Sequence, residues 1–282
     1  METGSSSQPN PALLRLTLPV LIRGRDRRSL DFLHFTSLRA EGFYSWINGR
    51  MGSDQEIGGI GTVNDLRNDL GLSLNELTWR IEGSVRPLEH HVIRAYGTIP
   101  ERYIGTNVLN RELRTRTSTY PAGSRVDSRF EIAAYGMGYD LDLLVGPSFF
   151  GGFHGDLIYM SSKVSFGTAP LRDADDVIAV HELVPCLGAH GELTSVFPFS
   201  RLTWGPKIGA FGRLTYAMTP NYLNYVDIKL GLSLRMQLAF GPILEARSAF
   251  EHESLFHDQE PISGKLLEYS RDGISFSLGA AF

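Results

Sequence analysis

One short stretch of the sequence could support covalent catalysis. His252 and Ser254 are separated by one residue, so a β-strand places both side chains on the same face. Folding the following hairpin about residue 260 places Glu268 opposite His252 on that face. A serine, a histidine and an acid can activate the serine hydroxyl for acyl transfer. Polar residues are common at loop bases, so we keep this triad as an alternative to a non-catalytic function.

Histidines also raise the question of a metal site. The pairs His154/Asp156 and His190/Glu192 are each spaced by two residues, so a strand places each pair on one face. Each pair offers two ligands, whereas a metal site needs three or four, which neighbouring strands would have to supply. We therefore expect no metal and no cofactor, and interpret these histidines as members of an internal hydrogen-bond network.

The composition excludes several classes of protein. The chain has 282 residues, a formal net charge of −4, 42% hydrophobic residues and a single cysteine. A small acidic balance argues against a nucleic-acid partner. One cysteine excludes a disulfide framework and a multi-thiolate metal site. The sequence holds no run of about 18 apolar residues, as a transmembrane helix requires.

Alternation with a period of two residues dominates the chain. From Ile274 to Phe282, apolar side chains occupy every second position and small or polar residues occupy the others. Residues 226–234 and 238–250 repeat this pattern, as do earlier segments. Such alternation predicts an all-β protein with one apolar face on each strand. A soluble sandwich would bury that face, whereas a transmembrane barrel would turn it toward lipid.

Three features favour an antiparallel, up-and-down transmembrane β-barrel. Several segments run past ten residues, which suits a tilted membrane strand. Aromatic residues gather near segment ends, and the apolar faces contain many small residues. The predicted map has about twelve strands, with ten possible because 57–71 and 105–118 are the weakest. The segments lie near 38–46, 57–71, 77–86, 91–99, 105–118, 125–138, 149–160, 183–197, 204–218, 224–236, 238–251 and 266–282.

The C-terminal strand resembles the assembly signal of bacterial outer-membrane β-barrels. The resemblance rests on Ile274, Phe276, Leu278 and the terminal Phe282, and extends as architecture from about residue 38 onward. It implies insertion into the outer membrane by the barrel-assembly machinery, and contact with outer-membrane lipids and lipopolysaccharide. The His252-x-Ser254 spacing with a downstream Glu268 is similar to the lipid A 3-O-deacylase family. This resemblance implies acyl hydrolysis in the outer leaflet, with Ser254 as the nucleophile, His252 as the base and Glu268 as the group that orients the base.

We divide the chain into an N-terminal segment, 1–37, and a barrel, 38–282. Residues 1–12 are polar and predict a flexible tail without the features of a signal peptide, so we interpret the chain as mature, with its signal peptide removed. A cytoplasmic protein is the alternative. In residues 13–28 the apolar stretch Leu13–Ile22 is followed by four arginines, Arg23, Arg25, Arg27 and Arg28, which suits a plug, a periplasmic docking segment or a strand extension.

The polar face of the strands predicts a charged lumen. The residues expected to line it are Arg39, Glu41, Arg80, Glu82, Asp127, Arg129, Glu131, Lys207, Arg213, Asp227, Lys229, Arg235, Glu245 and Arg247. Their signs nearly balance, so we expect pairing across strands, since unpaired buried charge is costly. The sequence predicts a non-catalytic barrel that is either a narrow small-solute channel or a salt-bridged membrane anchor for an envelope partner protein.

Overall fold

The structure, a computed structural model, describes residues 35–53, 64–73, 75–114, 118–146, 148–168, 176–196, 206–219, 223–238, 242–258 and 265–282. Described segments are strands, turns and short connections; none of them contains a helix of the length and apolarity that crossing a membrane would require. The predicted tail and the 13–28 segment lie outside the described residues.

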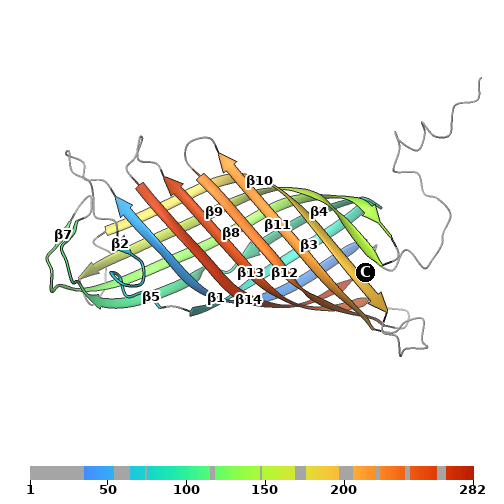
Figure 1. The fold of residues 1–282 in the computed structure, drawn as a ribbon, viewed down its shortest axis with the longest axis horizontal. Coiled ribbons are helices and arrows are strands. Elements are labelled where there is room, and N and C mark those ends of the chain that lie inside the picture. Colours follow the sequence, from blue (N-terminus) through green and yellow to red (C-terminus); the bar gives the residue numbers. More distant parts are fainter. Residues whose placement is uncertain are drawn as a thin grey trace, which may run out of the picture.

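Ten antiparallel strands form a closed barrel, in which each strand pairs with its neighbours in chain order and β14 pairs back with β1 (Figure 1). They are β1 (Thr36–Ser53), β3 (Asn75–Leu88), β4 (His91–Thr98), β8 (Arg125–Val145), β9 (Phe149–Thr168), β10 (Asp176–Val196), β11 (Lys207–Thr219), β12 (Leu223–Gln237), β13 (Ile243–Asp258) and β14 (Lys265–Ala281). An even strand number is typical of bacterial outer-membrane barrels. The all-β barrel is confirmed, with ten strands in its wall rather than twelve.

The two weakest predicted strands are the ones missing from the wall. Of the first, 57–71, the described part contains only the two-residue β2 (Asn64–Asp65) and a turn that ends at Gly71. The second, 105–118, overlaps β5 (Glu101–Val108) and β6 (Leu113–Arg114), which pairs with β7 (Thr119–Tyr120). β5 continues the line of β4 beyond Ile99-Pro100 and pairs with the first half of β8. A proline has no N–H for the ladder, which fits a break at this point.

The two ends of the wall meet at one end of the barrel, which we call the terminus end. There the Phe35 amide donates to the Phe282 carbonyl at 2.9 Å. The turns after β3, β8 and β12 are short and lie at this end. The connections between β1 and β3 and between β4 and β8 are long and lie at the opposite, loop end (Figure 1). Short turns face the periplasm in outer-membrane barrels, so the loop end faces outward from the cell.

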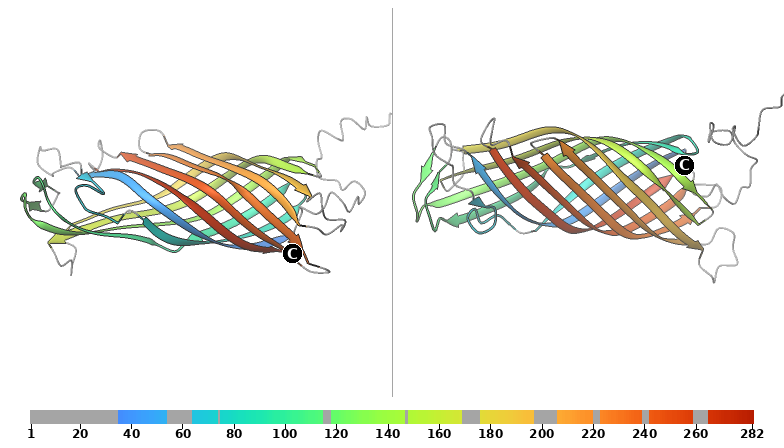
Figure 2. Two further views of the ribbon diagram at one scale, coloured as in Figure 1. Left: turned by 60° about the horizontal axis from the view of Figure 1, so that its bottom comes forward. Right: turned by 45° about the horizontal axis from the view of Figure 1, so that its top comes forward.

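An apolar belt surrounds the outside of the wall. On β12, Leu230 and Leu232 are 58% and 62% exposed; on β14, Phe276 and Leu278 are 61% and 72% exposed. Their ladder neighbours continue the belt around a closed wall, seen from two further sides in Figure 2. Large apolar side chains in such number need a hydrocarbon solvent. The soluble sandwich is therefore excluded, and the chain is an integral membrane barrel.

In the first half of β8, the side chains that point inward and those that point outward are the opposite of the prediction. Asp127, Arg129 and Glu131 were predicted to line the lumen, but they lie on the outer face, where Arg102 pairs with Glu131 at 3.0 Å. The side chains that point inward are instead Val126, Ser128, Phe130 and Ile132, all buried. These charged residues can lie on the outer face because this part of the wall extends beyond the membrane into water. Its inner face packs on an apolar core.

Candidate functional site

The terminus half of the barrel holds a charged cavity of about 220 Å³. Ten of the fourteen predicted lumen residues line it: Arg39, Glu41, Arg80, Glu82, Arg213, Asp227, Lys229, Arg235, Glu245 and Arg247. Lys207 lies outside the cavity, at the first position of β11 and opposite Arg235 in the ladder. These ten residues come from the polar faces of five strands, β1, β3, β11, β12 and β13, which converge on one cavity, as the alternation predicts.

Ion pairs between strands cross this cavity. Glu192 of β10 binds Arg235 at 2.7 Å and Arg247 at 3.2 Å. Glu245 binds Arg235 at 2.6 Å and reaches Arg39 of β1 at 2.8 Å. These contacts join β10, β12, β13 and β1 across the narrow interior.

A second group of ion pairs lies deeper in the barrel. Lys229 binds Glu251 at 3.1 Å and also Glu41, and Arg80 reaches Glu251 at 3.2 Å and Glu41 at 3.6 Å. Glu251 is fully buried. Paired charges can remain in such a place where single ones could not. We refer to the two groups together as the charged lattice.

The loop half of the barrel is filled by apolar side chains, which the sequence analysis did not foresee. We call this cluster the apolar core: Ile47, Met51, Leu66, Leu70, Leu72, Tyr103, Leu109, Leu113, Tyr120, Val126, Phe130, Ile132, Ile158, Met160, Val164, Phe166, Val180, Val184, Cys186, Ala217, Leu223, Tyr225, Leu255, Leu267 and Tyr269. Its members come from the wall strands and from the connections at the loop end. Phe130 packs near Tyr269, with ring centroids 5.7 Å apart.

Residues 64–73 and β5 dock against each other at the loop end. Leu72 forms a bridge with Gly105 of β5, and Asn107 Nδ2 donates to the carbonyls of Asn68 and Asp69 at 2.8 and 3.0 Å. A Cβ at position 105 would lie 2.1 Å from the Gly71 carbonyl oxygen, so only glycine allows this approach. The docking brings Leu66, Leu70 and Leu72 into the apolar core.

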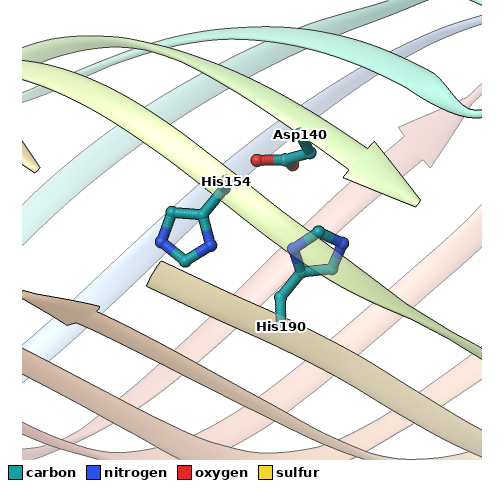
Figure 3. A group of neighbouring side chains, drawn as sticks. All are labelled: Asp140, His154 and His190. Atoms are coloured by element: carbon teal, nitrogen blue, oxygen red, sulfur yellow. The ribbon is translucent and has the colours of Figure 1, made fainter. Parts of the chain in front are cut away.

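A cluster of possible metal ligands lies beside the cavity. Asp140 of β8, His154 of β9 and His190 of β10 each offer one ligand atom, and these atoms all lie within 4.8 Å of one another. Asp140 is the direct ladder partner of His154. His190 lies two residues beyond Gly188, the partner of His154 on β10. Figure 3 shows the two imidazole rings each turning one nitrogen toward the other, with the Asp140 carboxylate alongside.

This cluster differs from the predicted pairs. His154 Nε2 lies 3.7 Å from Asp156 Oδ2, but Asp156 binds Arg94 at 2.6 Å and Arg213 at 3.0 Å. Glu192, the predicted companion of His190, belongs to the charged lattice. The structure thus replaces two separate two-ligand pairs with one three-residue cluster that spans three strands.

The predicted catalytic residues lie together on the outer face of β13 and β14, but in another combination. His252 Nδ1 is 2.7 Å from an oxygen of Asp272, its direct ladder partner. Glu268 lies opposite Phe256 instead and binds Arg50 at 2.8 Å. Glu268 as the orienting acid was therefore wrong, and Asp272 occupies that position. Ser254 is the next outward residue after His252, across from Ser270.

Ladder rows locate these residues at the outer boundary of the apolar belt. Phe250, Ile274 and Tyr44 form one outward row, and His252, Asp272 and Trp46 form the next. The next two rows toward the loop end are mainly polar. The first holds Ser254, Ser270 and Asn48, and the second holds Glu268, Arg50 and Phe256. Trp46 is the kind of side chain that marks a membrane interface.

The closed wall, the apolar belt and the charged interior define an integral β-barrel of the bacterial outer membrane.

No protein-family profile matches the chain, and no curated protein matches it in sequence. Solved structures resemble it in fold at low identity. The outer-membrane protease OmpT from Escherichia coli is 9% identical with a TM-score of 0.41, covering 87% of this chain and 97% of that one. The transport unit of the autotransporter AIDA-I from Escherichia coli is 10% identical with a TM-score of 0.42, covering 96% of each chain. The outer-membrane protein OprG from Pseudomonas aeruginosa is 10% identical with a TM-score of 0.28, covering 88% and 97%.

Proposed function

We propose that this protein is a non-conducting barrel that acts as a membrane anchor for an envelope partner. The observation that carries the proposal is the apolar core, which occupies the loop half of the lumen with side chains from β1, β8, β9, β10, β12, β13 and β14. Phe130, Val164 and Phe166 in this core are 0% exposed. Ions would have to pass through close-packed hydrocarbon, where an unpaired charge is strongly disfavoured.

The charged lattice supports the same conclusion from the other end of the lumen. A selective pore is built around groups that leave an ion path open, such as a ring of one sign. Here acidic and basic groups alternate and bind each other across the interior, as Glu192 does with Arg235 and Arg247. The lattice cross-links distant strands, which is what a rigid anchor requires.

The protruding part of the wall offers a surface for the partner. Outward-facing Arg125, Arg129 and Lys163 on β8 and β9 are exposed, with the Arg102–Glu131 ion pair beside them on β5 and β8. A polar, mixed-charge face above the membrane fits a protein partner of the envelope.

Single-channel recording in planar bilayers tests the closed lumen. We expect no steady openings from the wild-type barrel under conditions in which a general porin conducts. A variant that carries both Phe130→Ala and Tyr269→Ala removes two contacting rings from the apolar core, and should conduct transiently if it folds. Steady openings of the wild type would overturn the proposal.

Photo-crosslinking in intact cells tests the anchor role. A crosslinker at position 129 should give a product of one defined mass, and a crosslinker at position 232 in the lipid belt should not. Equal labelling at both positions, or none at position 129, would contradict a partner on the protruding wall.

A second candidate, outer-leaflet acyl hydrolysis, is favoured by the His252–Asp272 hydrogen bond at the membrane boundary. In this reaction Ser254 Oγ attacks an ester carbonyl and passes its proton to His252. The protonated histidine then protonates the departing alcohol, and water hydrolyses the acyl-enzyme. Asp272 orients His252 by accepting its Nδ1–H.

Mass spectrometry of lipopolysaccharide and phospholipid incubated with the purified barrel tests this candidate. The wild-type barrel should remove one acyl chain from the lipid. Ser254→Ala should remove none, and Asp272→Asn should remove it much more slowly. Glu268→Gln is the matched control, since Glu268 binds Arg50 rather than His252, and should retain activity. An unchanged lipid spectrum with the wild-type protein excludes the hydrolase.

A further inference from the structure

We propose that Asp140, His154 and His190 form a binding site for a divalent transition-metal ion such as Zn²⁺, inside the barrel beside the charged cavity. The three residues come from adjacent strands and hold their ligand atoms within 4.8 Å of one another. Two imidazoles and one carboxylate are the ligand types that zinc and its neighbours in the first transition row prefer. Ca²⁺ and Mg²⁺ prefer oxygen ligands and fit this site poorly.

The free nitrogens of the two histidines point to a missing ligand. Within the part of the chain that the structure describes, His154 Nδ1 and His190 Nδ1 are buried and have no hydrogen-bond partner. Both residues are closely enclosed: the His154 side chain is 0% exposed and that of His190 is 9% exposed. Buried polar atoms are almost always satisfied, so two unpartnered nitrogens in one cluster call for an explanation. A shared metal ion supplies it, because the rings direct these nitrogens toward each other (Figure 3).

The opposite nitrogens of both rings are held in the manner typical of metal-bound histidine. His190 Nε2 lies 2.7 Å from Asp142 Oδ1 and can donate to it only if the proton is on Nε2. This hydrogen bond leaves the Nδ1 lone pair free for a metal. His154 Nε2 lies 3.1 Å from Thr215 Oγ1, a hydroxyl that can accept in the same way. The Asp142 carboxylate thus fixes the His190 tautomer that a metal site needs, and the Thr215 hydroxyl is compatible with the same tautomer of His154.

Gly188 of β10 makes room for one of the ligands. A Cβ at this position would lie 2.3 Å from His154 Nε2 and 2.0 Å from the Leu214 carbonyl oxygen. Any larger residue would displace the His154 ring or push β11 away. The ring therefore lies across β10 toward Thr215 only because position 188 carries no side chain.

Arginines next to the cluster shape the affinity of the site. Arg94 Nε lies 3.0 and 2.9 Å from the two Asp140 oxygens, and Arg213 lies 3.6 Å from one of them. A carboxylate has about four lone-pair positions, so Asp140 can bind a metal while it keeps Arg94. The carboxylates of Asp142 and Asp156 offset the positive charge nearby. We expect a weaker site than one without arginines, with one ion per chain.

The cavity provides the route to the site. Asp140 and His190 line it, and so do Ser37 and Ala281 at the terminus end of the wall. Since that end faces the periplasm, the ion would come from periplasmic rather than external solution. Three protein ligands also leave a coordination position for water, as in open zinc sites.

Direct metal titration tests the proposal. Tag-free barrel, folded in detergent and stripped with a chelator that is then removed, is titrated with Zn²⁺ by calorimetry and with Co²⁺ by visible absorption. We expect one ion per chain. His154→Gln, His190→Gln and Asp140→Asn should each weaken binding more than tenfold. Asp142→Asn replaces the charged acceptor of the His190 Nε2–H with a neutral one and should weaken binding by about 10- to 100-fold.

The matched control is His181→Gln, a histidine of β10 that stacks on Tyr159 away from the cluster. It should bind both ions like the wild type. The folded state of every variant is checked by circular dichroism and by its heat-dependent mobility on gels. In addition, Zn²⁺ should raise the melting temperature of the wild type and of His181→Gln but not of His190→Gln, because a ligand of the native state stabilises it.

Two results would overturn the metal site. One is the lack of saturable Zn²⁺ and Co²⁺ binding by wild-type protein that is shown to be folded. The other is stoichiometric binding that persists unchanged in folded His154→Gln and His190→Gln. Neither result bears on whether the barrel conducts ions, so the site and the proposed anchor role are tested separately.

Discussion

Arg271 of β14 forms a buried ion pair with Glu101, 170 positions earlier in the chain. The same guanidinium also binds Glu253 of β13. Tyr103 completes the arrangement by donating to Glu101 at 2.7 Å, and its ring belongs to the apolar core. Arg271 therefore lies where the charged and the apolar halves of the lumen meet, and it ties the first residue of β5 to the wall.

Replacing Arg271 by methionine should destabilise the barrel by about 3–5 kcal/mol, because two buried carboxylates lose their counter-ion. Denaturant unfolding in detergent, followed by tryptophan fluorescence, measures this change. Arg50→Met is the matched control, since the Arg50–Glu268 pair is solvent-exposed and should contribute less than about 1 kcal/mol. Equal effects in the two variants would show that Arg271 is not the junction of the two halves.

The apolar belt predicts a position-dependent cost for a charge on the outer wall. Leu232→Arg places a guanidinium in the belt and should destabilise the barrel in bilayers by about 2–4 kcal/mol. Asn224→Arg lies on the same strand and the same face, but beyond the boundary row, and should cost about 0–1 kcal/mol. Reversible unfolding from lipid vesicles distinguishes the two. A similar cost at both positions would place the membrane boundary elsewhere.

Gly105→Ala should release residues 64–73 from β5. The new Cβ meets backbone atoms of Gly71 and Leu72 rather than a movable side chain, so the docked segment has to shift. Overpacking of this kind costs typically about 1–3 kcal/mol. Hydrogen exchange should show loss of protection at Ser73, whose amide donates to the Ile104 carbonyl of β5 at 3.0 Å. Gly83→Ala, whose Cβ would find its nearest neighbour 4.0 Å away, should leave this protection intact.

Truncation of the apolar core at Phe130 should cost about 3–5 kcal/mol, because the ring is fully buried against Tyr103 and Tyr269. Phe130→Leu keeps most of the apolar volume and should cost considerably less. Both values come from the same denaturant titration. If Phe130→Ala proved nearly neutral, the loop half of the lumen would not be a packed core.

Alternation was sufficient to predict the wall and most of its charged interior. Arg39, Glu41, Arg80 and Glu82 face the lumen because β1 keeps the period of two, as does β3 up to the register shift that follows Val85. The same rule failed at Arg129, since alternation tells which residues share a face but not how high that face stands in the membrane. Polar side chains of a strand point into the lumen where the strand crosses the membrane, and can point outward where the strand extends beyond it.

The site residues depended on strand ends that the sequence does not mark sharply. The predicted strand 125–138 stopped short of Asp140, whereas β8 continues to Val145, so the third ligand of the histidine cluster was missed. In the last hairpin, Glu268 follows from a turn centred on residue 260. The observed register pairs His252 with Asp272, so the turn is centred two residues later than predicted. The partner of His252 therefore moves by four residues, from Glu268 to Asp272.

Met51 of β1 and Leu267 of β14 are ladder partners, and both belong to the apolar core. The seam that closes the barrel therefore runs through the packed interior and joins the start of the wall to its last strand. A chain that lacks β14 would expose the apolar core to water. Closing the wall and excluding water from its interior are consequently one cooperative event, which waits until the final strand is in place.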